Sequence, residues 1–445
     1  MRQIDLQTAL DRARFNRFHG RLLFWCTLAI VLDGYDLAIV GISLPSIMKD
    51  MGVSSTHAGV MVSAALFGMA VGSVLLGTLA SHIGRRRAIA LCMFGFSLFS
   101  ALAALASNPV MFAVVRFIAG LGLGGIAPVI AAHMTEYAPR NFRSIAVTLT
   151  FSGYSVGGVV AALIGKGLLE SYGWQTVFFV AGLPILLVPF MLRAVPESLF
   201  NLMKRGRHAE VRKIVAQLDP QYVPRTDDQF ILAQGQAIGD ARVSGLFRDG
   251  RSVSTVLFWV VFFMSLFTVY GLSSWLTKLM ASAGYSLGSA LSFVLALNIG
   301  AVIGAIGGGW LADRISIKAV LMSMNLLAAV SIGLLGYTTA TVMLYLLIGV
   351  AGGCTIGAQI VAYAYAGQYY PVNIRSTGIG WAAGLGRSGA IFAPVLIGAL
   401  IGMMLPLKHN FIAMAIPAVI AAIAVAFIDR PKTAEPMFVG APANR

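Results

Sequence analysis

The chain has 445 residues, of which 58% are hydrophobic and only 11% are charged. Soluble proteins carry about 25% charged residues, so this composition excludes a soluble enzyme and indicates a polytopic membrane protein. The net charge of +15 does not predict nucleic-acid binding, because the basic residues are placed as membrane topology requires. All three cysteines fall in apolar stretches, which gives no support to a disulfide framework or a metal site.

Twelve apolar stretches of about 20 or more residues follow one another, and each is long enough to cross a bilayer as a helix. They begin near residues 22, 57, 88, 109, 144, 174, 255, 287, 319, 341, 376 and 409. The stretches are continuously apolar rather than alternating, which excludes a transmembrane β-barrel. The sequence therefore predicts an all-α membrane protein with twelve transmembrane helices.

The polar segments predict the domains and their orientation. We expect an N-tail over residues 1–21, a six-helix half over 22–193, a linker over 194–254, a second six-helix half over 255–428 and a C-tail over 429–445. The linker opens with an amphipathic pattern, which we interpret as one or two helices along the cytoplasmic face. A solvated linker helix that latches the halves is preferred to a binding role. Of the 32 Lys and Arg residues, 26 fall in the tails, the linker and the loops of that same side, and four on the other. The positive-inside rule places both termini in the cytoplasm.

The chain also repeats itself. The segment 77–86 aligns with 309–318, and the segment 136–144 aligns with 368–376, both with an offset of 232 residues. One offset shared by two separate loops predicts two six-helix halves in parallel orientation. Such transporter plans place a binding site at the midplane, between the repeats.

Four charged residues lie deep in the predicted spans: Asp33, Asp36, Arg116 and Arg387. A charge at membrane depth costs about 2.5–3.5 kcal/mol on the insertion scale, so such residues are usually functional. At 1.5 Å per residue, Asp33 and Arg387 are level near the midplane, and Asp36 lies one turn further on, where it suits Arg116. Carboxylates can bind a proton whereas arginines stay charged, so the aspartates are candidate proton carriers and the arginines candidate partners for them or for an anionic substrate. Static salt bridges are the alternative.

Aromatic, hydroxyl and amide side chains also interrupt the spans. Converging groups of these kinds suit a flat ring with polar substituents, although each could instead serve packing or the membrane interface. The candidate substrate-binding residues, besides Arg387, are Tyr35, Tyr154, Tyr270, Ser273, Ser274, Asn298, Gln359, Tyr363 and Trp381. The spans contain no Ser/His or metal-ligand constellation that would predict catalysis.

These residues resemble a known family. The loop GTLASHIGRRR at 77–87, and the glycine-rich stretch that follows Arg116, resemble signature segments of the major facilitator superfamily. The run Asp33-Gly-Tyr-Asp36 resembles the first helix of its aromatic acid/proton symporter family. Further matches, which extend the resemblance over essentially the whole chain, are Glu136-x-x-Pro139 with Arg143, Tyr270-Gly-Leu-Ser-Ser-Trp-Leu, and Gly384-Leu-Gly-Arg387-Ser-Gly.

The resemblance implies import of aromatic carboxylates, such as benzoate or hydroxybenzoates, by proton symport across a bacterial inner membrane. It implies no cofactor besides the coupling proton, and the self-contained twelve-helix plan favours a monomer. It assigns proton coupling to Asp33, Asp36, Arg116 and Glu136, and the substrate carboxylate to Arg387.

The signature loop and its repeats supply the expected gating residues. They are Gly77, Ser81, His82, Gly84, Arg86, Arg143, Asp313, Arg314 and Arg375. The chain departs from the family pattern at Ser81 and His82, where an Asp and an Arg are usual, and retains the Asp and Arg in its second half. We therefore expect a weaker cytoplasmic gate.

Three other functions remain open at this point. A proton-coupled drug or metabolite antiporter has the same fold, and the direction of flux would separate it. A symporter of aliphatic carboxylates would be distinguished by competition between benzoate and succinate. A membrane sensor of aromatic acids, or a membrane-embedded enzyme, would bind the ligand without accumulating it.

Overall fold

The computed structural model describes residues 3–6, 10, 13–139, 142–218, 222, 228–231, 243–248, 250–338, 340–370 and 374–428. Within these ranges, the side chains of four predicted gating residues lie outside the description: Ser81, Arg143, Asp313 and Arg375.

The predicted twelve spans are confirmed, each beginning within about five residues of its expected start. The first half consists of α2 (Arg17–Met51), α3 (Ser55–Ile83), α4 (Arg85–Ala103), α5 (Pro109–Tyr137), α6 (Arg143–Tyr172) and a sixth span made of α7 (Trp174–Gly182), η1 (Leu183–Leu187) and α8 (Val188–Ala194). The sixth span changes to a 3-10 helix where Pro184 and Pro189 remove backbone N–H donors. The second half consists of α11 (Ser252–Ser282), α12 (Leu287–Arg314), α13 (Ile317–Leu334), α14 (Thr341–Tyr369), α15 (Arg375–Gly402) and α16 (Leu407–Phe427).

The linker and the N-tail pack together at one end of the first half. The linker contains α9 (Leu199–Lys204), α10 (His208–Leu218), β2 (Gln229–Ile231) and η2 (Val243–Phe247), and β2 pairs in parallel with β1 (Gln3–Asp5) of the N-tail. Val211, Val215 and Leu218 of α10 are buried in a cluster with side chains of α2, α4 and α5. The apolar face of α10 is therefore covered by protein of the first half.

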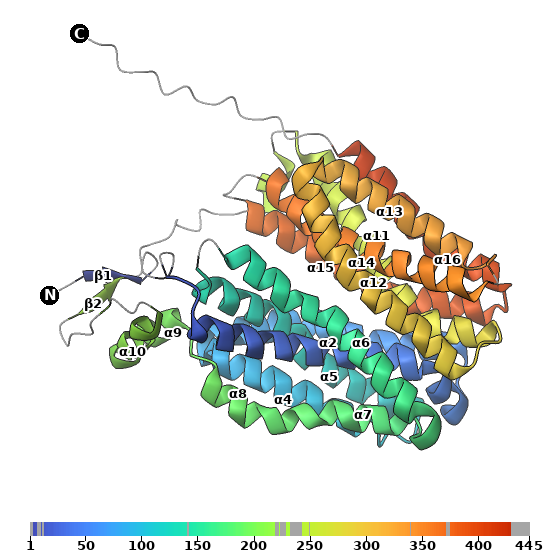
Figure 1. Ribbon diagram of the computed structural model, residues 1–445, viewed down its shortest axis with the longest axis horizontal. Helices are drawn as coiled ribbons and strands as arrows, with labels where there is room; N and C mark the ends of the chain where they lie inside the picture. The colour runs from blue at the N-terminus through green and yellow to red at the C-terminus, as the bar shows by residue number, and fades with distance from the viewer. Residues whose placement is uncertain are drawn as a thin grey trace, which may run out of the picture.

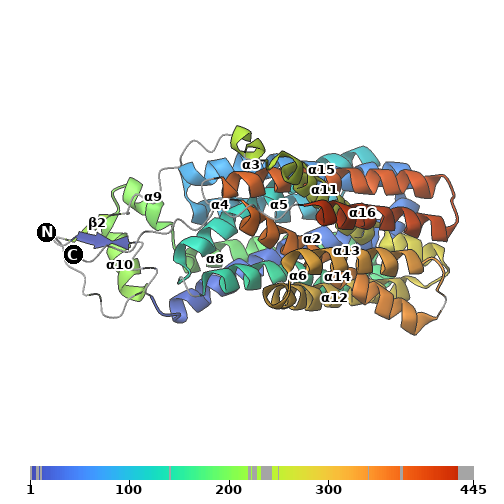
Figure 2. The same cartoon turned by 90° about the horizontal axis from the view of Figure 1, so that it is seen from above.

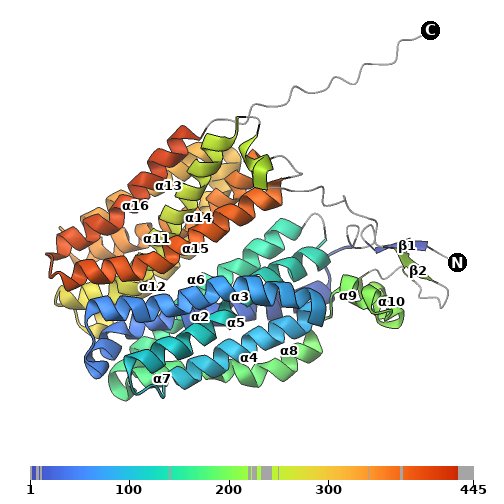
Figure 3. The same ribbon diagram turned by 180° about the vertical axis from the view of Figure 1, so that it is seen from behind.

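The two halves lie side by side, with α9 and α10 beyond one end of the bundle (Figures 1 and 2). We call this end the linker side and the opposite end the far side. The halves converge toward the far side and diverge toward the linker side (Figure 3).

Three hydrogen bonds join the halves in the far-side parts of the helices. The Ser63 hydroxyl donates to the Ile391 carbonyl at 2.6 Å, and Lys166 Nζ donates to Ser292 Oγ at 3.1 Å. The Gly288 N–H donates to Glu170 Oε1 at 3.0 Å. The halves are thus in direct contact on the far side.

Glycines hold α2 against α6 and thereby set the position of the charged residues. A Cβ at Gly34 would lie 2.4 Å from the Tyr154 carbonyl oxygen, and one at Gly157 would lie 2.1 Å from the Val31 oxygen. Only glycine permits such backbone contact between membrane helices. This close approach brings Tyr154 of α6 next to the acidic run of α2.

Candidate functional site

The two acidic residues of α2 have different partners, and Asp36 is paired with Arg116, as their depths predicted. Arg116 Nη1 donates to Asp36 Oδ2 at 2.8 Å and to Ser100 Oγ at 2.8 Å, while Nη2 donates to the Asp36 carbonyl at 3.4 Å. The Phe178 ring lies 5.7 Å from the guanidinium carbon, within the range of a cation–π contact. Both ionised side chains are only 1% exposed. This is an enclosed ion pair within the first half.

Asp33 is also fully buried, but it has no ionic partner in direct contact. The Tyr154 hydroxyl donates to its Oδ2 at 2.6 Å. Its Oδ1 is buried and has no hydrogen-bond partner in the described structure. A carboxyl group held by a single neutral hydrogen bond can take up a proton without breaking a salt bridge.

Arg387 of α15 approaches Asp33 from the second half. It is partly exposed, and it lies within electrostatic range of Asp33, Tyr154, Tyr270 and Tyr363. It makes no salt bridge or hydrogen bond to any side chain that the structure describes. The predicted level position of Asp33 and Arg387 thus brings them near each other without a direct bond, and the guanidinium donors of Arg387 stay available.

Gln359 borders this group of tyrosines. It lies one helical turn from Tyr363 on α14, and its amide oxygen and nitrogen are buried without a hydrogen bond of good geometry within the described residues. The structure therefore brings together six predicted residues from both halves: Asp33, Tyr154, Tyr270, Gln359, Tyr363 and Arg387. We call these six residues the central cluster.

Other candidates lie outside the central cluster. The Tyr35 hydroxyl donates to the Val177 carbonyl at 3.0 Å inside the first half, so it serves packing there. The backbone of Ser273 and Ser274 packs against Gly41 of α2 on the far side. Asn298 donates to the Val294 carbonyl of its own helix, and its amide oxygen faces Gly158 across the two halves.

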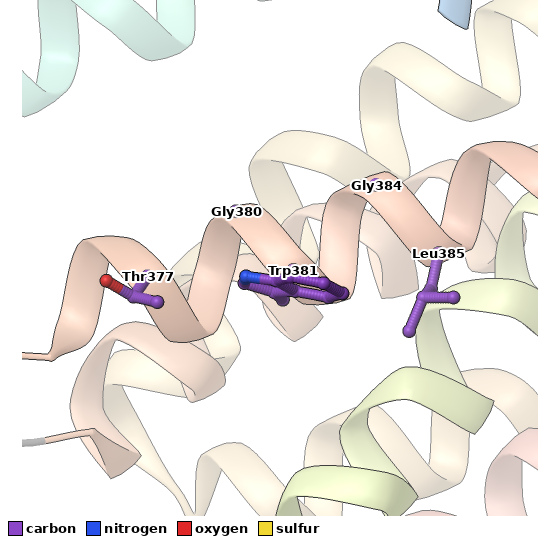
Figure 4. Close-up of a pocket in the computed structure, with 5 residues that line it drawn as sticks. All are labelled: Thr377, Gly380, Trp381, Gly384 and Leu385. Atoms are coloured by element: carbon purple, nitrogen blue, oxygen red, sulfur yellow. The ribbon is translucent and has the colours of Figure 1, made fainter. Parts of the chain in front are cut away.

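Trp381 also lies away from the cluster, toward the linker side. Its ring stacks on Trp259 of α11, with centroids 6.0 Å apart and planes inclined by 26°. It lines a cavity of about 440 Å³ together with Thr377, Gly380, Gly384 and Leu385 (Figure 4).

Glu136 lies at the linker-side end of α5 and bonds to residues that sequence reasoning did not assign to it. Its predicted neighbours Arg140 and Arg143 lie outside the described side chains, and within the description Arg85 forms a salt bridge to Glu136 Oε2. Glu136 also accepts hydrogen bonds from Ser198 Oγ at 2.9 Å and from the Leu199 N–H at 2.7 Å. All of these partners belong to the first half or its linker, so Glu136 fastens α9 to α4 and α5, far from Asp33.

The signature loop makes further contacts with the linker. Gly84 has φ +104°, and a Cβ there would lie 2.4 Å from Glu197 Oε2, so this position requires glycine. Arg205 Nη2 donates to the His82 carbonyl at 2.7 Å, and the Arg86 N–H donates weakly to Glu197 Oε1 at 3.4 Å.

The remaining described gating residues lie apart from the linker. Gly77 has open space at its Cβ position. Arg314 of α12 lies over the ring of Trp310, 4.2 Å from its centroid, on its own helix.

Sequence reasoning missed Ser100, Phe178, Arg85 and Glu197. Ser100 and Phe178 are ordinary residues of apolar helices, and only the fold brings them to Arg116. Arg85 and Glu197 carried a detectable signal, since each is a charged residue at the end of a predicted span. The loops that contain them were not expected to meet.

Comparisons with known proteins agree with this architecture. The family model of the Major Facilitator Superfamily matches residues 26–360 and 295–443. A benzoate transport protein of Acinetobacter baylyi is 41% identical over 450 residues, covering 100% of this chain and 97% of that protein. A 4-hydroxybenzoate transporter of Pseudomonas aeruginosa is 32% identical over 427 residues, covering 95% of each. Among solved structures, a D-xylose–proton symporter shares the fold with a TM-score of 0.70 at 19% identity, covering 93% of this chain and 98% of that one.

The family match and the identity over the full chain exclude an enzyme and establish a multi-pass transporter. Twelve membrane-spanning helices and bacterial relatives agree with a position in the bacterial inner membrane. The chain belongs to the major facilitator superfamily and, within it, to the group of aromatic acid transporters.

Proposed function

We propose that this protein imports single-ring aromatic carboxylates, of the benzoate and hydroxybenzoate type, together with protons. The observation that carries the proposal is the central cluster itself. Among the described residues, Arg387 has no bonded partner for its guanidinium and lies near three tyrosines and the buried Asp33, which has no ionic partner there either. A guanidinium binds a carboxylate through two parallel hydrogen bonds, and tyrosine rings contact the faces or edges of an aromatic ring. The names of the relatives support the substrate class.

We further propose that the linker side is cytoplasmic and that one chain forms the working unit. The excess of Lys and Arg in the tails and the linker supports this orientation. Both halves contribute to the central cluster, so no second copy is needed to complete it. The described conformation then corresponds to a cytoplasm-facing transporter.

Transport proceeds in our proposal by exchange of partners at the central cluster. When the site faces the periplasm, a proton neutralises Asp33 and removes its attraction for Arg387. The freed guanidinium binds the substrate carboxylate, and the halves rock to the conformation described here. In the cytoplasm the proton leaves, and the carboxylate of Asp33 then competes with the substrate for Arg387. A charge that crosses the membrane gains about 2.3 kcal/mol per 100 mV, so the potential drives uptake only when more protons than substrate charges enter.

Uptake of labelled benzoate into proteoliposomes with an imposed proton gradient tests the proposal. We expect accumulation in wild-type vesicles that collapses when the gradient is dissipated. The Asp33→Asn variant should bind benzoate and exchange it across the membrane, but it should not accumulate it. Asp50→Asn is the matched control, because Asp50 lies on the same helix and accepts its hydrogen bond from Trp174 at the far side.

Three results would contradict specific parts of the proposal. Full accumulation by Asp33→Asn would remove the proton-carrier role of that residue. Export of the acid against the gradient would favour an antiporter. Competition by succinate as strong as that by benzoate would favour an aliphatic substrate.

A further inference from the structure

The cavity beside Trp381 lies on the surface of α15 that faces the first half. On the far side, this surface contacts α3: Ser63 bonds to the Ile391 carbonyl, and a Cβ at Gly59 would lie 2.4 Å from the Pro394 oxygen. Counting back from Ile391 by four, three and four residues gives Arg387, Gly384 and Gly380, which therefore share this helix surface. The halves diverge toward the linker side (Figure 3), and Gly380 and Gly384 are exposed there. The two glycines of the cavity thus lie on the surface of α15 that faces the first half.

The floor of this cavity is a strip of bare backbone. Gly380 and Gly384 are both exposed, and a Cβ built at either would meet no atom within 4 Å. Glycines one turn apart leave a shallow groove along a helix, and the side chains of Thr377 and Leu385 border it. The residues that line the cavity carry no charge, so the groove suits an uncharged flat ring better than a carboxylate.

Trp381 gives the groove an aromatic wall. Its side chain is 44% exposed, although one part of the indole is covered by the stacked ring of Trp259. Trp259 is itself held edge-on by Phe247, with centroids 5.6 Å apart. Figure 4 shows the Trp381 ring lying alongside the helix between Thr377 and Leu385. A supported ring with an uncovered part is a surface on which another aromatic ring can stack.

The groove contains none of the residues of the central cluster, but it adjoins Arg387 along α15. Trp381 precedes Arg387 by six residues, a rise of about 9 Å along the helix. Among the described residues, Arg387 is within electrostatic range of tyrosines of the central cluster, whereas Trp381 contacts Trp259. A substrate leaving Arg387 toward the linker side passes along the strip that joins Arg387, Gly384 and Gly380.

We infer that the cavity lined by Thr377, Gly380, Trp381, Gly384 and Leu385 is a second subsite, which holds the aromatic ring of the substrate as it enters or leaves on the linker side. The ring stacks on Trp381 over the two glycines, while the carboxylate faces Arg387 or the water between the halves. This inference rests on the proposed function and adds a step to it. The subsite divides the passage between the central cluster and bulk water into two shorter steps.

Exchange kinetics in proteoliposomes test the subsite. Labelled benzoate is exchanged against unlabelled benzoate without a proton gradient, and the dissociation constant is measured separately by calorimetry on purified protein. Trp381→Leu should slow exchange about two- to tenfold, the range that aromatic stacking supplies, with an unchanged dissociation constant. Trp381→Phe should restore most of the rate, because it keeps an aromatic ring.

A second pair of variants tests the groove without touching the tryptophan. Gly384→Leu fills the groove and should also slow exchange. Gly307→Leu is its control, because Gly307 on α12 is likewise exposed with open space at its Cβ position and lies on the helix face opposite Asn298. Thermal unfolding of each purified variant verifies that the fold is intact.

The outcomes separate the subsite from the proposed function. Wild-type exchange rates in both Trp381→Leu and Gly384→Leu would overturn the subsite and leave the proposed function standing. Equal slowing by Trp381→Leu and Trp381→Phe would also overturn it, because stacking would then play no part. Absence of benzoate binding and exchange in the wild-type protein would overturn the proposed function and the subsite together.

Discussion

Two arginines lie within the membrane-spanning helices, and their surroundings differ. Arg116 is enclosed in the first half, where Asp36, Ser100 and Phe178 contact its guanidinium. Arg387 lies at the boundary between the halves, partly exposed, and makes no direct bond to a described residue. An arginine whose guanidinium bonds to residues of one six-helix half stabilises that half. An arginine with free donors at a moving boundary can bind something that comes and goes.

The largest effect should come from removing the enclosed arginine. Arg116→Leu leaves Asp36 buried and unpaired, which we expect to lower the free energy of unfolding by about 3–5 kcal/mol. The same change at the other position, Arg387→Leu, should leave stability near that of the wild type, because no ion pair is lost. Thermal unfolding in detergent measures both, and equal losses in the two variants would erase the distinction. Adding Asp36→Asn to Arg116→Leu should recover part of the loss, because it removes the unpaired charge.

The second effect concerns binding at Arg387. Lysine keeps the charge but cannot form the planar pair of hydrogen bonds to a carboxylate. We expect Arg387→Lys to weaken benzoate binding about 10- to 100-fold, the cost of losing charge-assisted hydrogen bonds. Calorimetric titration gives the dissociation constant, and an unchanged value would argue against capture of the carboxylate by this residue.

The third effect tests how the backbone places Tyr154 beside Asp33. The methyl group of Gly34→Ala would collide with the Tyr154 carbonyl, and relief of such overpacking costs about 1–3 kcal/mol. Gly20→Ala is the control on the same helix, where a Cβ meets no atom within 4 Å. Uptake and thermal stability should both fall in the first variant and stay level in the second. If both variants behave alike, close contact between α2 and α6 is not what positions this pair.

The smallest effect should come from Glu136, which the sequence had placed among the coupling residues. Its salt bridge to Arg85 is partly exposed, so Glu136→Gln should cost about 1 kcal/mol or less. Gradient-driven accumulation of benzoate should persist, because the partners that the structure describes for Glu136 all lie in the first half and its linker. Loss of accumulation comparable to that expected for Asp33→Asn would indicate that Glu136 is needed for proton coupling.

The membrane spans, and the depths of the aspartates and arginines within them, could be predicted from the sequence because each depends only on the residues of one helix. Helix length follows from the apolar thickness of a bilayer, and depth follows from the rise per residue. This was sufficient to pair Asp36 with Arg116 and to set Asp33 level with Arg387. The repeat with its single offset was likewise readable, because it needs only self-comparison.

The direction in which side chains point could not be predicted in the same way. Tyr35 lies between the two acids in sequence, yet it faces Val177 inside the first half, since neighbouring positions of a helix point about 100° apart. Trp381 and Arg387 both lie on α15, but Trp381 lies nearer the linker side and stacks on Trp259, whereas Arg387 lies near Asp33. The bond from Arg85 to Glu136 joins the ends of α4 and α5, and which helix ends meet is fixed by tertiary packing that no local pattern records.

The joint packing of the N-tail and the linker has a consequence for the order in which the chain is made. All of the buried described side chains of the cluster that holds α9 and α10 in place lie before residue 231, and both strands of the small parallel sheet end by residue 231. Once this stretch has left the ribosome, the chain holds all of these buried side chains, so the first six helices can pack together while the second half is still being translated. Partly buried contacts, those of Tyr270 and Ile391 among them, are added afterwards.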